Sequence, residues 1–425
     1  MNRAWAFSVR WVVVLCAALA STAFGQAIAP SPGFKIGDGA IHPYAQIDAR
    51  YDSFVGYFNE VTPGVLSPTG DLILHFRPGV KFNLDNDNTF IGFNGSGEYL
   101  LYTGVMNPGS RALSRFQAAV SLDTAFNKQG AVEVKLGDSL VRSDRTQNPA
   151  LGIGAISLYN NVYLQAPIHP GGKALEITPK VSWGVEFFQK LVTGIAPFCP
   201  DSEPQCDPAR SNYSNLNFGT TAKWKFFPKT ALLLDVNADW RAYFADATNN
   251  KVMFHALAGL SGLLSPKISV TLLGGYGGDF TNGSIHTFIG NAEFAYTFSP
   301  TARVAVGYAR NASPVPVVGA LIDDRGYLRG GVGFLSNRLT INGQFSVDYL
   351  TFLGAPAAGT TTPNPTRHDV LLSFNVTPTF TVVSWFDVSL SYTLSYRASQ
   401  NTVGTATVGL NYLRHEAMLR LDFHY

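Results

Sequence analysis

The acidic pair Asp235 and Asp239 has residue types and a spacing that chemistry could use. Two carboxylates on one strand face could act as a general acid and a general base, as in glycoside hydrolysis. Arg241 follows on the same face, and an arginine beside two carboxylates pairs with them as a fixed counter-charge. We therefore predict that these side chains belong to an internal polar surface and that the protein is not an enzyme.

Other chemical motifs are incomplete. His415 and Glu416 lack a second histidine at the spacing that a zinc-binding helix requires. The glycine-rich stretch 274–278 precedes no helical pattern, so it indicates a strand end rather than a phosphate cradle. The sequence contains no G-x-S-x-G nucleophile motif. It therefore predicts no catalytic residue, no metal site and no cofactor.

The composition narrows the class of protein. Of 425 residues only 14% are charged, 13% are aromatic and 41 are glycine, and the formal net charge is +2. This apolar content excludes a disordered chain. The absence of a basic excess argues against a nucleic-acid partner. A helical bundle would instead be rich in Ala, Glu, Lys and Leu.

The N-terminal segment resembles an export signal. Arg3 and Arg10 precede an apolar run over 11–20, which is too short to span a bilayer, and small residues follow near 23–25. We predict a signal peptide over 1–25, a short periplasmic segment over 26–42 and a barrel over 43–425. Removal of 1–25 leaves equal numbers of acidic and basic residues.

Two cysteines remain after that removal, Cys199 and Cys206, both in the longest predicted loop, 191–213. An exported chain folds in an oxidising compartment, so we predict a disulfide between them. Two free loop thiols are the alternative.

Strict alternation of apolar and polar residues is the main structural signal. In 72–84 the side chains of Leu72, Leu74 and Phe76 share one face, whereas His75 and Arg77 share the other. The same alternation recurs in 116–126, 216–226, 339–349 and 388–396. These runs are longer than strands of soluble sheets and match strands that cross a bilayer at a tilt. A soluble β-helix or sandwich, the alternative, would show shorter strands and a fixed short repeat.

Turn signals fix the expected strand number. Short turns are predicted at 85–88, 127–130, 169–173, 227–229, 265–267, 299–301, 336–338 and 377–379. Longer loops are predicted at 55–70, 103–112, 143–154, 191–213, 244–251, 278–286, 311–324, 353–366 and 398–402. Eight turns and nine loops predict a closed, all-β, antiparallel transmembrane barrel of about 18 strands, with short periplasmic turns and longer extracellular loops.

The last strand carries an assembly signal and one irregularity. Alternation from Ala417 ends on the aromatic Tyr425, which resembles the signal recognised by the barrel assembly machinery of the outer membrane. In 406–412 the apolar residues have even numbers, whereas from Ala417 onward they have odd numbers. We therefore predict a bulge near Arg414, where one extra residue would bring both sets to the same face.

The polar face should point into the lumen, where no ring of a single charge is apparent. The predicted lumen-lining residues are Asp48, Arg50, His75, Arg77, Lys81, Glu98, Gln117, Asp123, Glu133, Lys135, Lys180, Glu186, Lys223, Lys225, Asp235, Asp239, Arg241, Glu293, Arg303, Arg329, Asp348, Asp369 and Asp387. On the same parity, Phe90 and Tyr102 either stack on sugar rings or fill space near the rims.

Two segments, 48–52 (DARYD) and 77–85 (RPGVKFNLD), carry a family resemblance. The chain resembles the outer-membrane β-barrel porin family associated with bacterial exopolysaccharide export, and is similar to polysaccharide-secretion barrels of the myxobacterial type. The resemblance covers nearly the whole mature chain. It implies a separate outer-membrane translocon that works beside a periplasmic polysaccharide-export protein, and it assigns no functional residues.

These observations predict a channel of the bacterial outer membrane, surrounded by lipid, that passes a hydrophilic solute. Export of a polysaccharide is the sharper hypothesis. A general or sugar-selective porin and a non-conducting scaffold or adhesin are the alternatives. Too few residues precede the first strand for a folded plug domain, although a loop could fold inward.

Overall fold

The computed structural model describes residues 33–62, 65–148, 153–172, 174–191, 208–245, 247–281, 285–315, 319–353, 366–399 and 411–425. The predicted signal peptide and the predicted Cys199–Cys206 disulfide lie outside these residues and stay predictions. No helix within the described ranges is both long and apolar enough to cross a bilayer. The 3₁₀ helices are η1 (Pro108–Leu113), η3 (Pro208–Ser211) and η4 (Ala247–Asn249).

The strands are β1 (Phe34–Ile36), β2 (Gly39–Thr62), β3 (Val65–Asp85), β4 (Thr89–Tyr102), β5 (Arg115–Phe126), β6 (Val134–Asn148), β7 (Ile153–Gln165), β8 (Leu175–Leu191), β9 (Tyr213–Phe227), β10 (Thr230–Tyr243), β11 (Lys251–Ser265), β12 (Ile268–Asp279), β13 (His286–Ser299), β14 (Ala302–Val315), β15 (Gly319–Phe334), β16 (Leu339–Leu353), β17 (Thr366–Val383), β18 (Phe386–Ser399) and β19 (Tyr412–His424).

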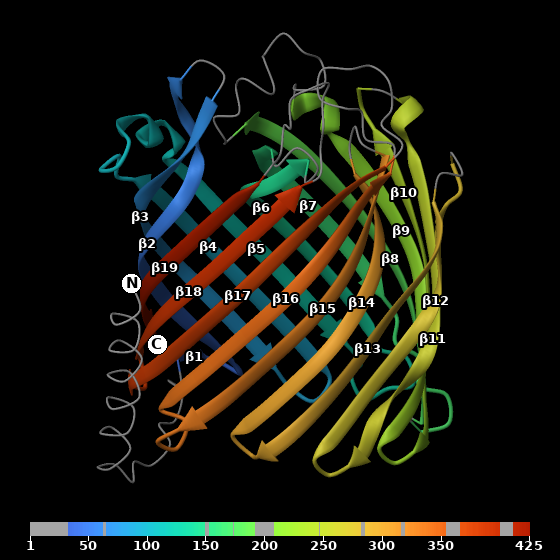
Figure 1. Ribbon diagram of the computed structural model, residues 1–425. Helices are drawn as coiled ribbons and strands as arrows, with labels where there is room; N and C mark the ends of the chain where they lie inside the picture. Colours follow the sequence, from blue (N-terminus) through green and yellow to red (C-terminus); the bar gives the residue numbers. More distant parts are fainter. Residues whose placement is uncertain are drawn as a thin grey trace.

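The sheet closes on itself. Each strand from β2 onward pairs antiparallel with the next, and β19 pairs with β2, so the 18 strands β2–β19 of the described chain form a complete ring (Figure 1). The predicted 18-stranded closed barrel is therefore confirmed. The short β1 pairs with the start of β2, just beyond the point where β19 ends. There the backbone N–H of Tyr425 donates to the carbonyl of Pro43.

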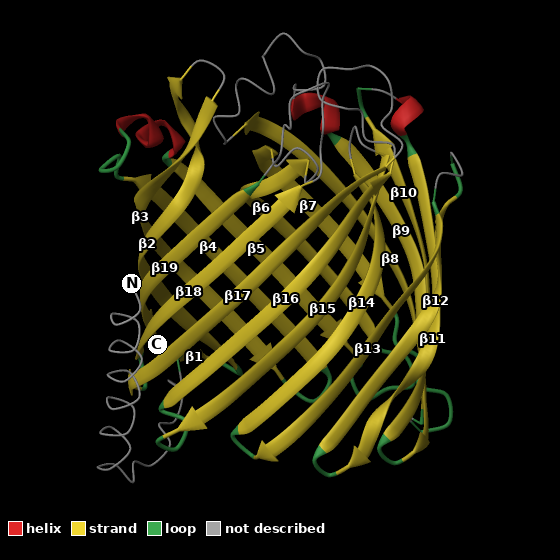
Figure 2. Ribbon diagram, viewed as in Figure 1, coloured by secondary structure: helices red, strands yellow, loops and turns green. Residues whose placement is uncertain are grey.

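Seven of the eight predicted short turns join consecutive strands, and the eighth is wrong. The segment 377–379 lies inside β17, which turns into β18 only at 384–385 (Figure 2). Pro378 suggested a turn because proline cannot donate to a strand ladder. The ladder between β17 and β18 passes from Val376 to Thr379 and skips Pro378, so the strand tolerates the missing donor.

Three further expectations about irregular segments need correction. The predicted loops 55–70 and 311–324 are largely strand, because β2–β3 and β14–β15 continue as hairpins to within a few residues of their turns. The predicted bulge near Arg414 is absent from the described residues. The strand β19 keeps one register from Tyr412 to its end, and 406–410 lie outside the described chain.

The two faces of the sheet have opposite chemistry. On the outer face large apolar side chains such as Phe76 and Leu122 are 52% and 43% exposed. On the inner face buried side chains include the carboxylates Asp52, Asp348 and Asp369, each at most 2% exposed. This distribution is the reverse of a water-soluble core. It fits a cylinder that meets an apolar medium outside and holds its polar groups inside.

Tyrosines on the inner face join strands that are not neighbours. Tyr163 on β7 lies across Gly137 of β6, and its hydroxyl donates to Asp123 of β5 at 2.6 Å. A Cβ added to Gly137 would stand 2.3 Å from the ring of Tyr163, so only glycine leaves this path open. The same arrangement recurs where Tyr327 crosses Gly307 to reach Glu293, and where Tyr44 crosses Gly79 to reach Asn94.

We predict that Gly137→Ala destabilises the barrel by about 1–3 kcal/mol, because the new methyl group displaces the Tyr163 ring from a close-packed wall. The free energy of unfolding in denaturant is the measurement. Gly326→Ala is the matched control, since an added Cβ there meets nothing within 4 Å. Equal stabilities for the two variants would contradict the bridge.

Candidate functional site: the inner wall and its recess

The structure places the sequence-predicted lumen residues on the inner face of the sheet. This face is identified by bonds that reach across an intervening strand, such as Lys180 on β8 with Asp235 on β10 at 3.8 Å. The residues with this parity are Asp48, Arg50, His75, Arg77, Lys81, Asp123, Glu133, Lys135, Glu186, Lys223, Lys225, Asp235, Asp239, Arg241, Glu293, Arg329, Asp348 and Asp369.

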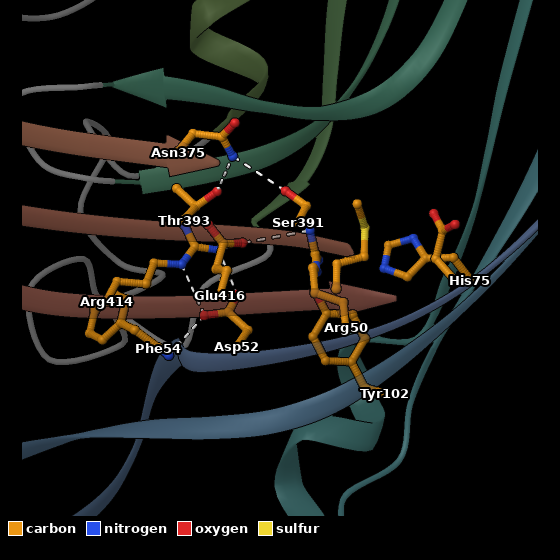
Figure 3. Close-up of polar contacts among 12 residues, drawn as sticks. Arg50, Asp52, Phe54, His75, Tyr102, Asn375, Ser391, Thr393, Arg414 and Glu416 are labelled. Carbon is orange, nitrogen blue, oxygen red and sulfur yellow. Dashed lines mark hydrogen bonds and ion pairs between the residues drawn. The ribbon is translucent and has the colours of Figure 1, made fainter. Parts of the chain in front are cut away.

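The seam between the first and last strands of the ring is bridged by charged groups. Arg414 donates to both carboxylate oxygens of Asp52, at 2.9 and 2.5 Å (Figure 3). Arg420 does the same to Asp48, at 2.8 and 3.0 Å. Glu416 lies beside Arg414 (Figure 3), and its Oε1 is 3.0 Å from the Nη2 of that arginine. In each pair two parallel hydrogen bonds join the guanidinium to the carboxylate, and this bidentate arrangement is stronger than a single hydrogen bond.

Further pairs neutralise charge along the adjoining wall. Arg397 on β18 donates to Asp369 on β17 at 3.0 Å, and both side chains are buried. Arg325 on β15 pairs with Asp348 on β16.

On the other side of the seam, Glu98 accepts hydrogen bonds from two side chains of β3. The ring nitrogen Nδ1 of His75 lies 2.7 Å from one oxygen of Glu98, and Arg77 donates to the other oxygen. The wall from β15 to β4 therefore carries many charges and little net charge.

Asp235 and Asp239 do not form a joint acid–base site. Asp235 contacts Lys180 and the ring of His255, which lies 3.3 Å away. Asp239 contacts Arg241 at 3.9 Å. Each carboxylate has its own cationic partner, so the arrangement offers counter-charges rather than a paired general acid and base. No cluster of three or more metal-binding side chains occurs within the described chain.

Some predicted residues stay apart from these pairs. Lys135 approaches Glu133 at 3.4 Å near the short-turn end of the barrel. No ion pair joins Lys223 or Lys225 to another described residue, and both side chains are exposed.

A recess of about 530 Å³ opens in the inner wall over β2–β6 and the end of β19, and we call it the β2–β6 recess. The recess is deepest at Ser96 and Ala119, because these small side chains leave space that longer ones would fill. Longer polar side chains surround the floor: Tyr44, Gln46, Arg77, Lys81, Asn94, Glu98, Gln117, Asp422 and His424.

Hydrogen bonds hold the border of the recess in place. Gln46 donates to Asp422 at 2.8 Å and accepts from Arg77 at 3.1 Å. The ammonium group of Lys81 stands 5.1 Å from the ring centre of Tyr44. The recess therefore offers donors, acceptors and both signs of charge on side chains whose positions are already fixed, as a site for a polar solute requires.

The aromatic side chain of Tyr102 is used for packing. It is 5% exposed and lies in a small buried cluster with Val55, Ile73 and Leu100. This position supports the space-filling interpretation over sugar stacking for Tyr102.

Several inner-wall charges are not among the predicted lumen residues, including Asp52, Arg397, Arg414, Glu416 and Arg420. Alternation alone could have placed Arg414, Glu416 and Arg420 on the inner face, had the strand been read from Tyr412 without a bulge. Their partners could not be deduced, because the seam joins residues more than 360 positions apart.

Comparison with known proteins gives a likeness in structure alone. No protein-family model and no curated protein sequence matches this chain. Among solved structures, Pseudomonas aeruginosa OccK2 (OpdF) in complex with glucuronate matches with a TM-score of 0.50 and 11% identity, over 92% of this chain and 99% of that chain.

Two other solved structures match over a similar length. The outer membrane protein opdK from Pseudomonas aeruginosa has a TM-score of 0.49 and 10% identity, over 91% of this chain and 99% of that chain. OccAB3 of Acinetobacter baumannii has a TM-score of 0.47 and 10% identity, over 92% of this chain and 100% of that chain. The predicted localisation is confirmed: this protein is a β-barrel of the bacterial outer membrane.

We predict that Arg414→Leu destabilises the barrel by about 3–5 kcal/mol, because it leaves the buried carboxylate of Asp52 without its counter-charge. Arg329→Leu is the control, since that arginine pairs with Glu293 but is 53% exposed and should cost at most about 1 kcal/mol. Denaturant unfolding of both variants is the measurement. A loss no larger for Arg414→Leu than for Arg329→Leu would show that the seam does not depend on this pair.

Proposed function

We propose that the protein is an outer-membrane channel for small hydrophilic solutes, with hydroxyl-rich molecules of the size of a sugar as the preferred class. The observation that carries this proposal is the β2–β6 recess, a polar site of fixed geometry in the wall of a closed 18-stranded barrel. Barrels of this size are wide enough to hold an aqueous path.

The charge distribution supports a neutral or weakly charged solute. In the recess Arg77 and Lys81 are balanced by Glu98 and Asp422. Elsewhere on the inner wall most carboxylates have a cationic partner within 4 Å. A channel selective for phosphate would instead present a ring of unpaired cations, because selectivity for charge needs a net field.

The porin interpretation takes precedence over polysaccharide export. The solved structures that resemble this chain are outer-membrane proteins, and one of them, OccK2, was solved with glucuronate, a sugar acid. These comparisons give no support to a polysaccharide substrate or to a periplasmic export partner.

Reconstitution tests the proposal. The purified barrel in liposomes should admit a monosaccharide and a disaccharide faster than a long dextran, measured by the rate of liposome swelling, and should conduct ions in a planar bilayer. A barrel that conducts no ions and admits no sugar would refute the channel function. Passage of long polymers at rates equal to those of monosaccharides would instead favour export.

We predict that Ala119→Phe, which fills the recess, slows sugar entry several-fold while small-ion conductance falls much less, because ions do not need the fixed donors and acceptors. Thr221→Phe on β9 adds a ring to the inner wall outside the recess, four strands along the ring from β5, and is the control for simple narrowing. The swelling rate and the single-channel conductance are measured for both variants. If the two variants slow sugar entry equally, sugar passage does not depend on the recess, and that part of the proposal is wrong.

A further inference from the structure

The outer face of β6–β8 interrupts the apolar belt with polar side chains. Asp138 and Arg142 lie on β6, Asn160 lies on β7 and Gln189 lies on β8. Asn160 donates to Asp138 at 2.8 Å, and Arg142 donates to Gln189 at 3.2 Å. We call these four residues the β6–β8 patch.

Strand register shows that the patch faces outward. Asp138 pairs directly with Leu122, and Asn160 pairs directly with Leu140; these leucines are 43% and 42% exposed on the outer face. Residues directly opposite each other in a sheet share a face. Arg142 also donates to the backbone carbonyl of Phe116, whose side chain is 51% exposed on the same face.

The position of Asp138 along the strand makes lipid an unfavourable neighbour. It lies four residues beyond the start of β6, and its outward neighbours along the strand, Leu136 and Leu140, are apolar and 47% and 42% exposed. A carboxylate and an amide among such side chains are costly when they face hydrocarbon. On neighbouring β5 the outward positions at the same heights are Val120 and Leu122.

A hollow of about 530 Å³ lies beside the patch on the same outer surface. Leu164, Val181, Phe218, Val236 and Phe254 line it, and Leu164 is two residues along β7 from the strand partner of Asp138. Polar groups next to an apolar depression resemble the composition of a protein interface more than that of a surface in contact with lipid.

We propose that the β6–β8 patch is a contact between two copies of this chain, related by a two-fold axis in the outer membrane. The patch carries a carboxylate and a guanidinium on one strand, so two identical patches turned about a two-fold axis can pair the Asp138 carboxylate of one copy with the Arg142 guanidinium of the other. An anionic lipid headgroup would bind the Arg142 guanidinium, but the Asp138 carboxylate would add no attraction to it. This proposal goes beyond the channel function and does not depend on it.

Cysteine cross-linking in isolated outer membranes tests the contact. In a background with Cys199→Ser and Cys206→Ser, Leu140→Cys places a thiol between Asp138 and Arg142. Leu328→Cys on β15 places a thiol on the opposite side of the ring at similar exposure, 48% against 42%. Mild oxidation should yield a disulfide-linked dimer for Leu140→Cys at several times the yield for Leu328→Cys. Equal yields, or a cross-link to a different protein, would overturn the proposal.

Removal of the charge separates a specific contact from lipid exposure. Asp138→Leu should weaken dimer formation in mild detergent about tenfold, measured by light scattering across a concentration series, while the folded mobility in unheated gels and the liposome-swelling rate stay unchanged. If Asp138 faces lipid instead, the leucine variant gains stability and its oligomeric state equals that of the wild type. That result would reject the proposal even if the channel activity is confirmed.

Discussion

Closure of the hydrogen-bonded ring is the constraint on which the rest of this structure depends. A bilayer offers no water to backbone N–H and C=O groups, so every strand must find a partner on both sides. The pairing of β19 with β2 meets this requirement, and the terminal Tyr425 continues it through its backbone contact with Pro43. Once the ring is closed, successive side chains of a strand point alternately to the outer face and to the lumen, and the apolar set lies on the outer face.

The inner wall manages its charges by pairing them. Asp48 and Asp52 are almost completely buried, yet each meets a forked arginine from the last strand. The pairs hold the seam from within and remove the net field that unpaired carboxylates would create. In the channel that we propose, such a wall would discriminate among solutes by shape and hydrogen bonding more than by charge.

Packing on the inner wall is as specific as in a soluble core. Tyr163 reaches Asp123 only because Gly137 leaves its path open, and the β2–β6 recess exists because Ser96 and Ala119 lie among longer side chains. Alternation shows which residues face inward but not which of them touch. Tyr102 has the same parity as Glu98, yet one packs in an apolar cluster while the other borders the recess.

The sequence by itself determined the class of fold, the strand number and the alternation of apolar and polar faces, because a period of two and the spacing of turns are local properties of the chain. The local pattern misplaced a turn at Pro378, because it does not reveal that the ladder with β18 has a gap there. It also predicted a bulge near Arg414, where the described strand keeps one register. Only the tertiary structure decided that Arg414 meets Asp52, since contacts across the seam depend on how the whole ring closes.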